Sequence, residues 1–377
     1  MRKNLSRVTI MILLSSVIVV MSFAGLFAEE VRDPLERPAL IMKQPNKSVL
    51  LGVTAAGQRL VAVGERGIVI LSDDDGKTWR QAKVPVSVTL TGVFFVTPEK
   101  GWIVGHSGIV LHSEDGGETW VKQLDGIQAA RLALDAANVQ LQKKNDGDSK
   151  ILEKKITAAK LLVDDGPDKP FLDLYFKNEK TGFIIGAYNL IFRTEDGGET
   201  WQPWLDHVEN PEGLNLYCIR PSGEYLYIAG ERGLFLRSND DGNTFSAFST
   251  PYQGSYFGLM AWGEKVVLFG LRGHAFCSED RGGSWQKSET GVLNSITAGV
   301  QFKKGTPFLV TQTGDILVGE DPGRGGACSF RPVPLCESPS ISGITESGDG
   351  SLIVAGLTGV SRVVNPIQLT KGDGKGK

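Results

Sequence analysis

Short apolar runs separated by turn residues recur about every 40 residues along most of this chain. The clearest unit spans residues 90–124, where strand-like runs at 90–96, 101–105, 109–112 and 120–124 alternate with turns rich in Gly, Ser and Asp. Runs of this length bounded by turn residues are typical of β-strands. Each unit therefore predicts a four-stranded meander.

The turn between the third and fourth strands carries an eight-residue motif, S-x-D-x-G-x-T-W. Five copies begin at Ser72, Ser113, Thr194, Ser238 and Ser278. We expect each Asp carboxylate to accept hydrogen bonds from turn amides, each Gly to supply unusual backbone angles, and the aromatic residue to pack into the sheet. The pattern thus predicts a structural role for Asp74, Asp115, Asp196, Asp240 and Asp280.

The spacing between successive motifs sets the number of sheets. Motif starts lie 41, 81, 44 and 40 residues apart, and two further units without the motif occupy residues 306–318 and 341–363. The last unit lacks a fourth strand, whereas an unassigned apolar segment, residues 39–42, precedes the first unit. Repeated sheets closed in a ring form a β-propeller. We therefore predict an all-β, seven-bladed propeller closed by this N-terminal strand, with six or eight blades as alternatives.

The 81-residue interval contains an insertion at residues 126–168 with helical periodicity. Apolar residues in 4-3-4 spacing place each of two sets on one helix face, and a polar turn separates the sets. The sequence predicts an antiparallel helical hairpin on the same face as the loops between second and third strands. One hypothesis is that its lysines contact anionic lipid or an acidic partner, and a solvated helix surface is the alternative. These lysines are Lys143, Lys144, Lys150, Lys154 and Lys155.

The N-terminus resembles an export signal. Three basic residues precede an uncharged, apolar run at residues 8–28, which ends in small residues. We expect residues 1–28 to form a signal peptide, with an uncleaved membrane anchor as the alternative. Cleavage is plausible after Ala24 or after Ala28, and no cysteine lies near either site, so a lipid anchor is not expected. The propeller would then occupy residues 29–366, followed by a disordered tail at 367–377.

Charge and cysteine content narrow the function classes. The formal net charge of -3 gives no electrostatic support for nucleic-acid binding. Four cysteines are too few for a disulfide scaffold and lack the paired spacing of a metal site. Cys328 and Cys336 are close enough to bridge a loop, whereas Cys218 and Cys277 are expected to be isolated buried thiols.

The loops between the second and third strands, here called the rim loops, share a G-x-x-G frame and should surround one mouth of the central channel. Arg66, Arg232 and Arg272 occupy the same position in three of them. Three arginines on one rim suit an acidic or carboxylate-bearing partner. The alternative is that these are surface arginines paired with Glu65 and Glu231. The other candidate partner-binding residues are Glu65, Glu231, His106 and Tyr188.

The S-x-D-x-G-x-T-W motif is the Asp-box of the bacterial neuraminidase repeat, which raises the question of glycosidase chemistry. The resemblance to sialidases implies an Arg-Ile-Pro motif, an arginine triad and a Tyr nucleophile with its Glu. The chain has no Arg-Ile-Pro, and no general acid and base pair is apparent. No cofactor or metal motif is visible either. A sialidase-like, glycan-active propeller remains the alternative hypothesis.

The complete repeat, with Gly101-Trp102-Ile103-Val104-Gly105 ahead of Gly108 and the Asp-box at Ser113–Trp120, resembles the photosystem II stability/assembly factor family more closely. The resemblance covers residues 45–364. It implies a non-catalytic seven-bladed propeller on the lumenal side of a membrane that binds a newly made reaction-centre protein. We therefore predict an exported, monomeric scaffold without a cofactor that binds a membrane protein or envelope complex. Its location would be the periplasm, or the thylakoid lumen in a phototroph, either free or membrane-associated.

Overall fold

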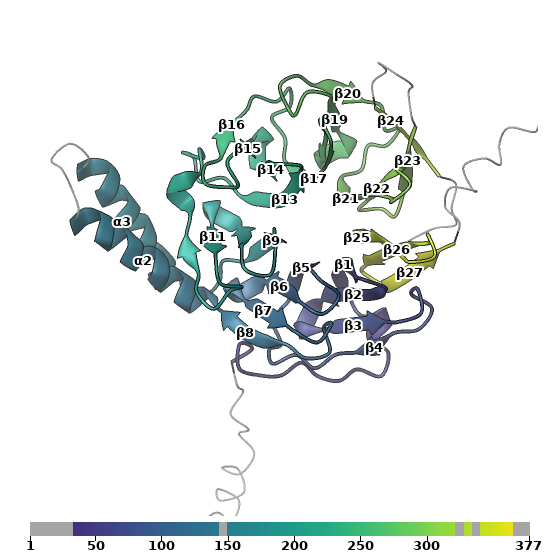
Figure 1. Ribbon diagram of the computed structural model, residues 1–377, viewed down its shortest axis with the longest axis horizontal. Coiled ribbons are helices and arrows are strands. Elements are labelled where there is room, and N and C mark those ends of the chain that lie inside the picture. Colours follow the sequence, from purple (N-terminus) through teal and green to yellow (C-terminus); the bar gives the residue numbers. More distant parts are fainter. Residues whose placement is uncertain (1–32, 143–148, 321–327, 334–339, 365–377) are drawn as a thin grey trace, which may run out of the picture.

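The computed structural model describes residues 33–142, 149–320, 328–333 and 340–364. Seven antiparallel sheets stand around a common centre, and a pair of helices projects outward from the ring (Figure 1). Within each sheet the strands follow chain order from the centre outward. The chain is therefore mostly β, with propeller-like sheets, as the repeat pattern predicts.

The first six sheets have four strands each, and the seventh has three among the described residues. The first and second sheets contain β1 (Leu50–Ala56), β2 (Arg59–Gly64), β3 (Val69–Ser72), β4 (Arg80–Gln81), β5 (Leu90–Phe95), β6 (Gly101–Gly105), β7 (Val110–Ser113) and β8 (Val121–Leu124). The third and fourth contain β9 (Phe171–Phe176), β10 (Gly182–Gly186), β11 (Ile191–Thr194), β12 (Gln202–Pro203), β13 (Leu216–Ser222), β14 (Tyr225–Gly230), β15 (Phe235–Ser238) and β16 (Ser246–Ala247). The fifth and sixth contain β17 (Tyr256–Trp262), β18 (Lys265–Gly270), β19 (Ala275–Ser278), β20 (Gln286–Ser288), β21 (Ile296–Gln301), β22 (Pro307–Thr311), β23 (Ile316–Glu320) and β24 (Ser329–Pro332). The seventh contains β25 (Ile341–Glu346), β26 (Leu352–Gly356) and β27 (Gly359–Val363).

The segment at residues 39–42 does not complete the seventh sheet, so the predicted closing strand is wrong. Instead it runs beside β4: the Ala39 amide donates to the Val84 carbonyl at 3.0 Å, and the Met42 amide donates to Oε1 of Gln81 at 2.8 Å. The chain meets the seventh sheet later, at Pro45–Lys47, where a Cβ on Gly359 would lie 1.8 Å from the Asn46 carbonyl oxygen. The Leu40 carbonyl also accepts from Nε2 of Gln81 at 2.9 Å, so three backbone groups of this segment are hydrogen-bonded to the first sheet and its following loop rather than to β27.

The core consists of seven apolar clusters, each filling the seam between two neighbouring sheets. One cluster joins Leu50 and Ile70 of the first sheet to Ala355 of the seventh. Because each sheet is covered on both faces, its second strand is buried along nearly its whole length. This explains why these strands appear as continuous apolar runs in the sequence.

Each Asp-box forms the predicted turn. At Asp115, Oδ1 accepts from the Ser113 hydroxyl at 2.8 Å and from the Thr119 amide at 3.0 Å, and Oδ2 accepts from the Thr119 hydroxyl at 2.6 Å. The same three bonds recur at Asp74, Asp196, Asp240 and Asp280. The Trp120 ring closes the turn: it is buried, and its Nε1 donates to the Gly117 carbonyl at 2.9 Å. These aspartates accept local hydrogen bonds, as expected from the sequence.

Two helices follow β8, as the periodicity of this segment predicts: α2 (Gly126–Gln142) and α3 (Ser149–Asp164), which pack against each other (Figure 1). Asp125 caps α2, because its Oδ1 accepts from the Gln128 amide at 3.0 Å while Oε1 of Gln128 accepts from the Asp125 amide at 3.2 Å. Buried Ala130 and Ala137 on α2 and Ala159 on α3 come from the two apolar sets of the sequence. Residues 143–148, which include Lys143 and Lys144, lie outside the described residues.

Candidate functional site

The rim loops lie on one face of the ring and the Asp-boxes on the other. In each sheet the first residue of the rim loop donates its amide to the carbonyl just before the innermost strand. The seven accepting carbonyls belong to Val49, Thr89, Pro170, Asn215, Ser255, Ser295 and Ser340. Asp-box amides instead bond the turn between the first and second strands, for example Gly116 to Glu99 at 2.8 Å and Arg281 to Glu264 at 2.8 Å. The Asp-boxes are thus placed across the ring from the rim loops.

Five rim loops have a left-handed residue at the tip. Their φ angles lie between 53° and 57°, at Arg66, Ser107, Tyr188, Arg232 and Arg272. The residue after the tip also has positive φ, which is the backbone of a type I′ turn. At Gly67 a Cβ would lie 2.1 Å from the Val86 carbonyl oxygen, so glycine is required there. The G-x-x-G frame therefore fixes the turn and leaves the tip residue free to vary.

The structure brings the three predicted arginines to equivalent, exposed positions. Arg232 pairs with Glu212 at 2.8 Å, both on the surface. Glu231 instead accepts the Asn215 amide at 3.2 Å, so the alternative pairing of Arg232 with Glu231 is wrong. Within the described part of the chain, the side chains of Arg66 and Arg272 make no ion pair. Two guanidinium groups on this face are therefore available to an anionic partner.

The remaining predicted residues lie on the same face in different settings. His106 is exposed at the first position of the second rim loop, and Glu65 is half-buried at that position in the first. Tyr188 is the tip of the third loop, and Nζ of Lys169 lies 5.0 Å from the centre of its ring. These residues belong to three different sheets and share one face of the ring. In the described part of the chain their side chains do not contact one another.

A central cavity of about 200 Å³ is lined by the innermost strands of all seven sheets. It contains an ion pair that the sequence analysis did not identify: Nη1 of Arg220 on β13 donates to Oδ2 of Asp173 on β9 at 2.5 Å. The same oxygen accepts the Ile219 amide at 2.8 Å. The Arg220 side chain is 45% exposed within the cavity, and that of Asp173 is 13% exposed. The sequence signal that could have revealed this pair is Asp173, a charged residue inside the apolar run Phe171–Phe176.

The helical hairpin leans against the third sheet. Asp206 bridges the two: its carboxylate pairs with Lys155 of α3 and accepts from Nε2 of Gln140 of α2. In the structure the Lys155 side chain is therefore engaged by an acid next to the third sheet. Lys154 is exposed on α3, and the Lys150 side chain lies outside what the structure describes. Between helices and sheet lies a cavity of about 350 Å³, here called the hairpin pocket.

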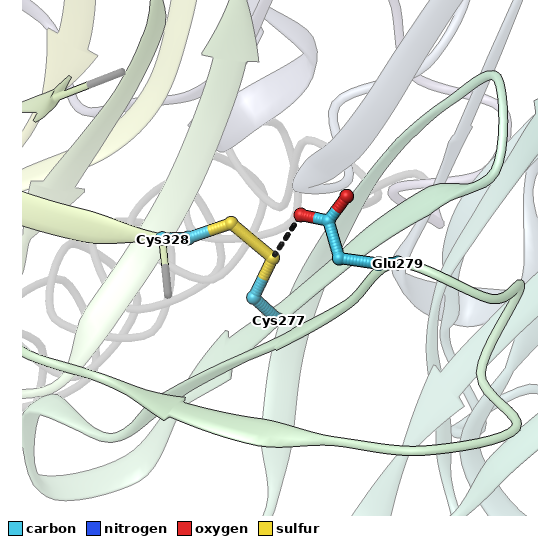
Figure 2. A group of neighbouring side chains, drawn as sticks. All are labelled: Cys277, Glu279 and Cys328. Carbon is cyan, nitrogen blue, oxygen red and sulfur yellow. Dashed lines mark hydrogen bonds between the residues drawn. A yellow bond between two sulfur atoms is a disulfide. The ribbon is translucent and has the colours of Figure 1, made fainter. Parts of the chain in front are cut away.

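The cysteines pair differently from the sequence prediction. Cys277 on β19 forms a disulfide with Cys328, just before β24, across the seam between the fifth and sixth sheets (Figure 2). Cys218 is buried and free, and Cys336 lies outside the described residues. Glu279 lies beside the two sulfurs, and these three residues are the one group with metal-ligand spacing in the described ranges. Because the sulfurs are bonded to each other, this state offers no thiolate ligand.

Comparison with known proteins places the chain in a family. The model of the photosynthesis system II assembly factor YCF48 family matches residues 71–145 and 156–323. The chain belongs to this family. Among relatives, the photosystem II assembly lipoprotein Ycf48 of Synechococcus sp. (strain CC9902) is 26% identical over 156 residues, 41% of this chain and 47% of that protein. The chain thus spans about half the length of that relative.

Solved structures show the same fold. A structure of YCF48 bound to a D1 peptide superposes with a TM-score of 0.58 at 17% identity, covering 87% of this chain and 99% of that one. The WD40 β-propeller domain of Doa1 gives 0.59 at 10% identity, with coverages of 87% and 95%. At these identities the likeness concerns the fold. In the described ranges no helix has the length and apolar character needed to span a bilayer.

Proposed function

We propose that this protein is a non-catalytic, exported assembly factor that binds a segment of a membrane protein through its rim-loop face. Two observations support this proposal: the chain belongs to the family, and one face of the ring exposes side chains at the tips of repeated loops. Five of the seven rim loops share one left-handed turn, and four of their tip side chains are exposed: Arg66, Tyr188, Arg232 and Arg272. Variable residues on a rigid, repeated frame are the usual design of a recognition surface.

Charge on this face suggests the chemistry of the client. Arg66 and Arg272 are exposed, and Arg232 pairs with the surface acid Glu212. Breaking an exposed ion pair of this kind costs little free energy. Guanidinium groups bind carboxylates through two parallel hydrogen bonds. We therefore propose that the client segment carries carboxylates. The YCF48 of the solved structure binds a D1 peptide, and a comparable membrane-protein segment is the client proposed for this chain.

A pull-down from detergent-solubilised membranes tests this proposal. We expect the wild-type protein to retain a membrane-protein partner, and the triple variant Arg66→Ala, Arg232→Ala, Arg272→Ala to lose at least about 90% of it, since each exposed charge contact contributes a fraction of the binding free energy. Retention should also fall as salt is raised. Equal capture by wild type and variant would refute the rim as the binding face.

A matched control removes three positive charges from the opposite face, through Lys77→Ala, Lys303→Ala and Lys304→Ala. Lys77 lies in an Asp-box turn, and Lys303 and Lys304 lie in the turn between β21 and β22. This variant should capture the partner as well as wild type does. A similar loss in both variants would indicate net charge rather than a defined face.

The glycan-active alternative is tested separately. Fluorogenic sialosides and aryl glycosides should show no turnover above buffer. Turnover that Arg66→Ala or Arg272→Ala abolishes would establish a glycosidase and overturn the proposed scaffold function.

A further inference from the structure

The hairpin pocket is a built cavity that the rim-loop proposal does not use. Its volume of about 350 Å³ lies in the range of ligand pockets. Small residues form the helical walls, and the third sheet supplies the floor. The principal lining residues are Ala133, Ala137, Ala158, Leu162, Tyr188 and Leu205.

Alanines explain why the cavity stays open. Protein interiors normally close such spaces, because unfilled volume forfeits dispersion contacts. Here the helices are held near the sheet by polar contacts at Asp206, while Ala133 and Ala158 extend too short a side chain to reach it. Larger apolar residues at these positions would fill the space. The structure therefore keeps an apolar volume accessible beside the rim.

The charged groups around the pocket are already paired. Lys155 pairs with Asp206, and Lys169 pairs with Asp165 at 3.0 Å and with Asp168 at 2.7 Å. A charged occupant would lose hydration without gaining an unpaired partner, which is costly. The pocket therefore favours an uncharged, apolar group.

The pocket is continuous with the rim-loop face through Tyr188. This residue is the tip of the third rim loop and also lines the pocket, and its side chain is 62% exposed. Leu161 on the helical wall is 59% exposed. Two large exposed apolar side chains thus flank the opening. Interfaces of this kind anchor a partner by an aromatic or branched side chain inserted in a pocket.

We propose that the hairpin pocket receives an uncharged aromatic or branched apolar side chain of the client segment bound at the rim loops. That the occupant belongs to the client segment rests on the proposed function. That the occupant is uncharged and apolar rests on the residues that line the pocket. The two can therefore fail separately.

Alanine methyl NMR tests the ligand class directly. With ¹³C-methyl alanine, N-acetyltryptophanamide should cause saturable shifts in the methyls of Ala133, Ala136, Ala137, Ala158 and Ala159, and the anionic N-acetylglutamate should not. Shifts scattered over alanines elsewhere, or absent from these five, would overturn the proposal. Shifts caused by octyl glucoside and not by N-acetyltryptophanamide would assign the pocket to acyl chains and refute a side-chain occupant.

A filled pocket tests the link to the client. Ala158→Phe places a ring in the cavity from an exposed position on α3, and Thr157→Phe adds the same ring to the neighbouring exposed position outside it. Circular dichroism and the melting temperature establish that both variants fold. Ala158→Phe should abolish the methyl shifts and weaken binding of overlapping D1 peptides about 10-fold, the loss expected for one anchor. Thr157→Phe should behave as wild type.

The outcomes separate the two proposals. If peptides bind wild type and Ala158→Phe equally but lose affinity in the rim arginine variant, the proposed function stands and the pocket assignment is refuted. If Ala158→Phe weakens peptide binding and the control Thr157→Phe does not, the pocket assignment is supported. If no peptide binds wild type, both the D1-like client and the occupant proposed for the pocket are overturned.

Discussion

Reduction of the Cys277–Cys328 disulfide should destabilise the protein strongly. The bond joins β19 of the fifth sheet to the segment leading into β24 of the sixth, across an apolar seam. The two cysteines are separated by 51 residues. In the chain-entropy treatment, closing a loop of this length lowers the entropy of the unfolded chain enough to contribute about 4 kcal/mol at 25 °C. That is a large share of the stability of an ordinary domain.

The assay is urea unfolding followed by tryptophan fluorescence, with and without dithiothreitol. The free energy of unfolding of wild type should fall by about 4 kcal/mol on reduction. The variant Cys277→Ala, Cys328→Ala should be similarly destabilised and no longer respond to the reductant. As a control, Cys218→Ala removes a buried cysteine that is not in the bond and should keep the response. If the free energies of unfolding of oxidised and reduced wild type differ by less than about 1 kcal/mol, the reasoning is refuted.

Peptide mapping under non-reducing conditions checks the pairing independently. A linked pair containing Cys277 and Cys328 is expected. Disulfide-linked peptides containing Cys328 and Cys336 would instead support the pairing that sequence proximity favours, and would contradict the bond between the two sheets.

Two further predictions concern the core and the Asp-boxes. Trp102 is fully buried, stacks on Phe176 with ring centres 3.6 Å apart, and donates Nε1 to the Gly197 carbonyl of the neighbouring Asp-box at 3.1 Å. Trp102→Ala should lower the free energy of unfolding in urea by about 3–5 kcal/mol, and a loss below about 1 kcal/mol would show that this seam repacks freely. Hydrogen bonds from the Ser284 amide and the Ser278 hydroxyl lower the pKa of Asp280 to about 2. A carboxyl whose pKa is lower in the folded state than the unfolded value of 3.8 stabilises the fold above that pH, and this stability is lost as the pH falls toward 2. Asp280→Asn should therefore reduce the fall in melting temperature between pH 4 and 2. An unchanged pH profile would argue against this contribution.

The repeating turns determined most of the fold from the sequence alone. Hydrogen bonding within an Asp-box is local, since the Ser, Asp and Thr of one copy lie within seven residues, so the motif specifies the same turn wherever it occurs. Regular spacing then placed the strands between turns, including β22 and β23 in a unit without the motif. The helical hairpin followed from its own periodicity. The outward positions of Arg66, Arg232 and Arg272 followed from the rim-loop frame for the same reason.

Contacts between distant segments could not be predicted in this way. The local pattern shows that residues 39–42 are apolar, but their place beside β4 depends on the Gln81 side chain and the Val84 carbonyl. Similarly, Glu231 is the sequence neighbour of Arg232, yet Glu212 is its partner in space. The sequence shows which residues can pair, and the packing of sheets decides which of them meet.

The cysteine pairing and the cavities also depend on contacts between segments that are distant in the sequence. Cys336 is near Cys328 in sequence, whereas Cys277 faces it because the fifth and sixth sheets pack together. The Asp173–Arg220 pair and the hairpin pocket likewise arise where separate elements converge. The sequence by itself determined the repeated sheets, the turns and the inserted helices, since these depend on interactions over a few residues. Only the tertiary structure decided the disulfide, the central ion pair and the pocket beside the rim, because each requires residues from elements brought together by packing.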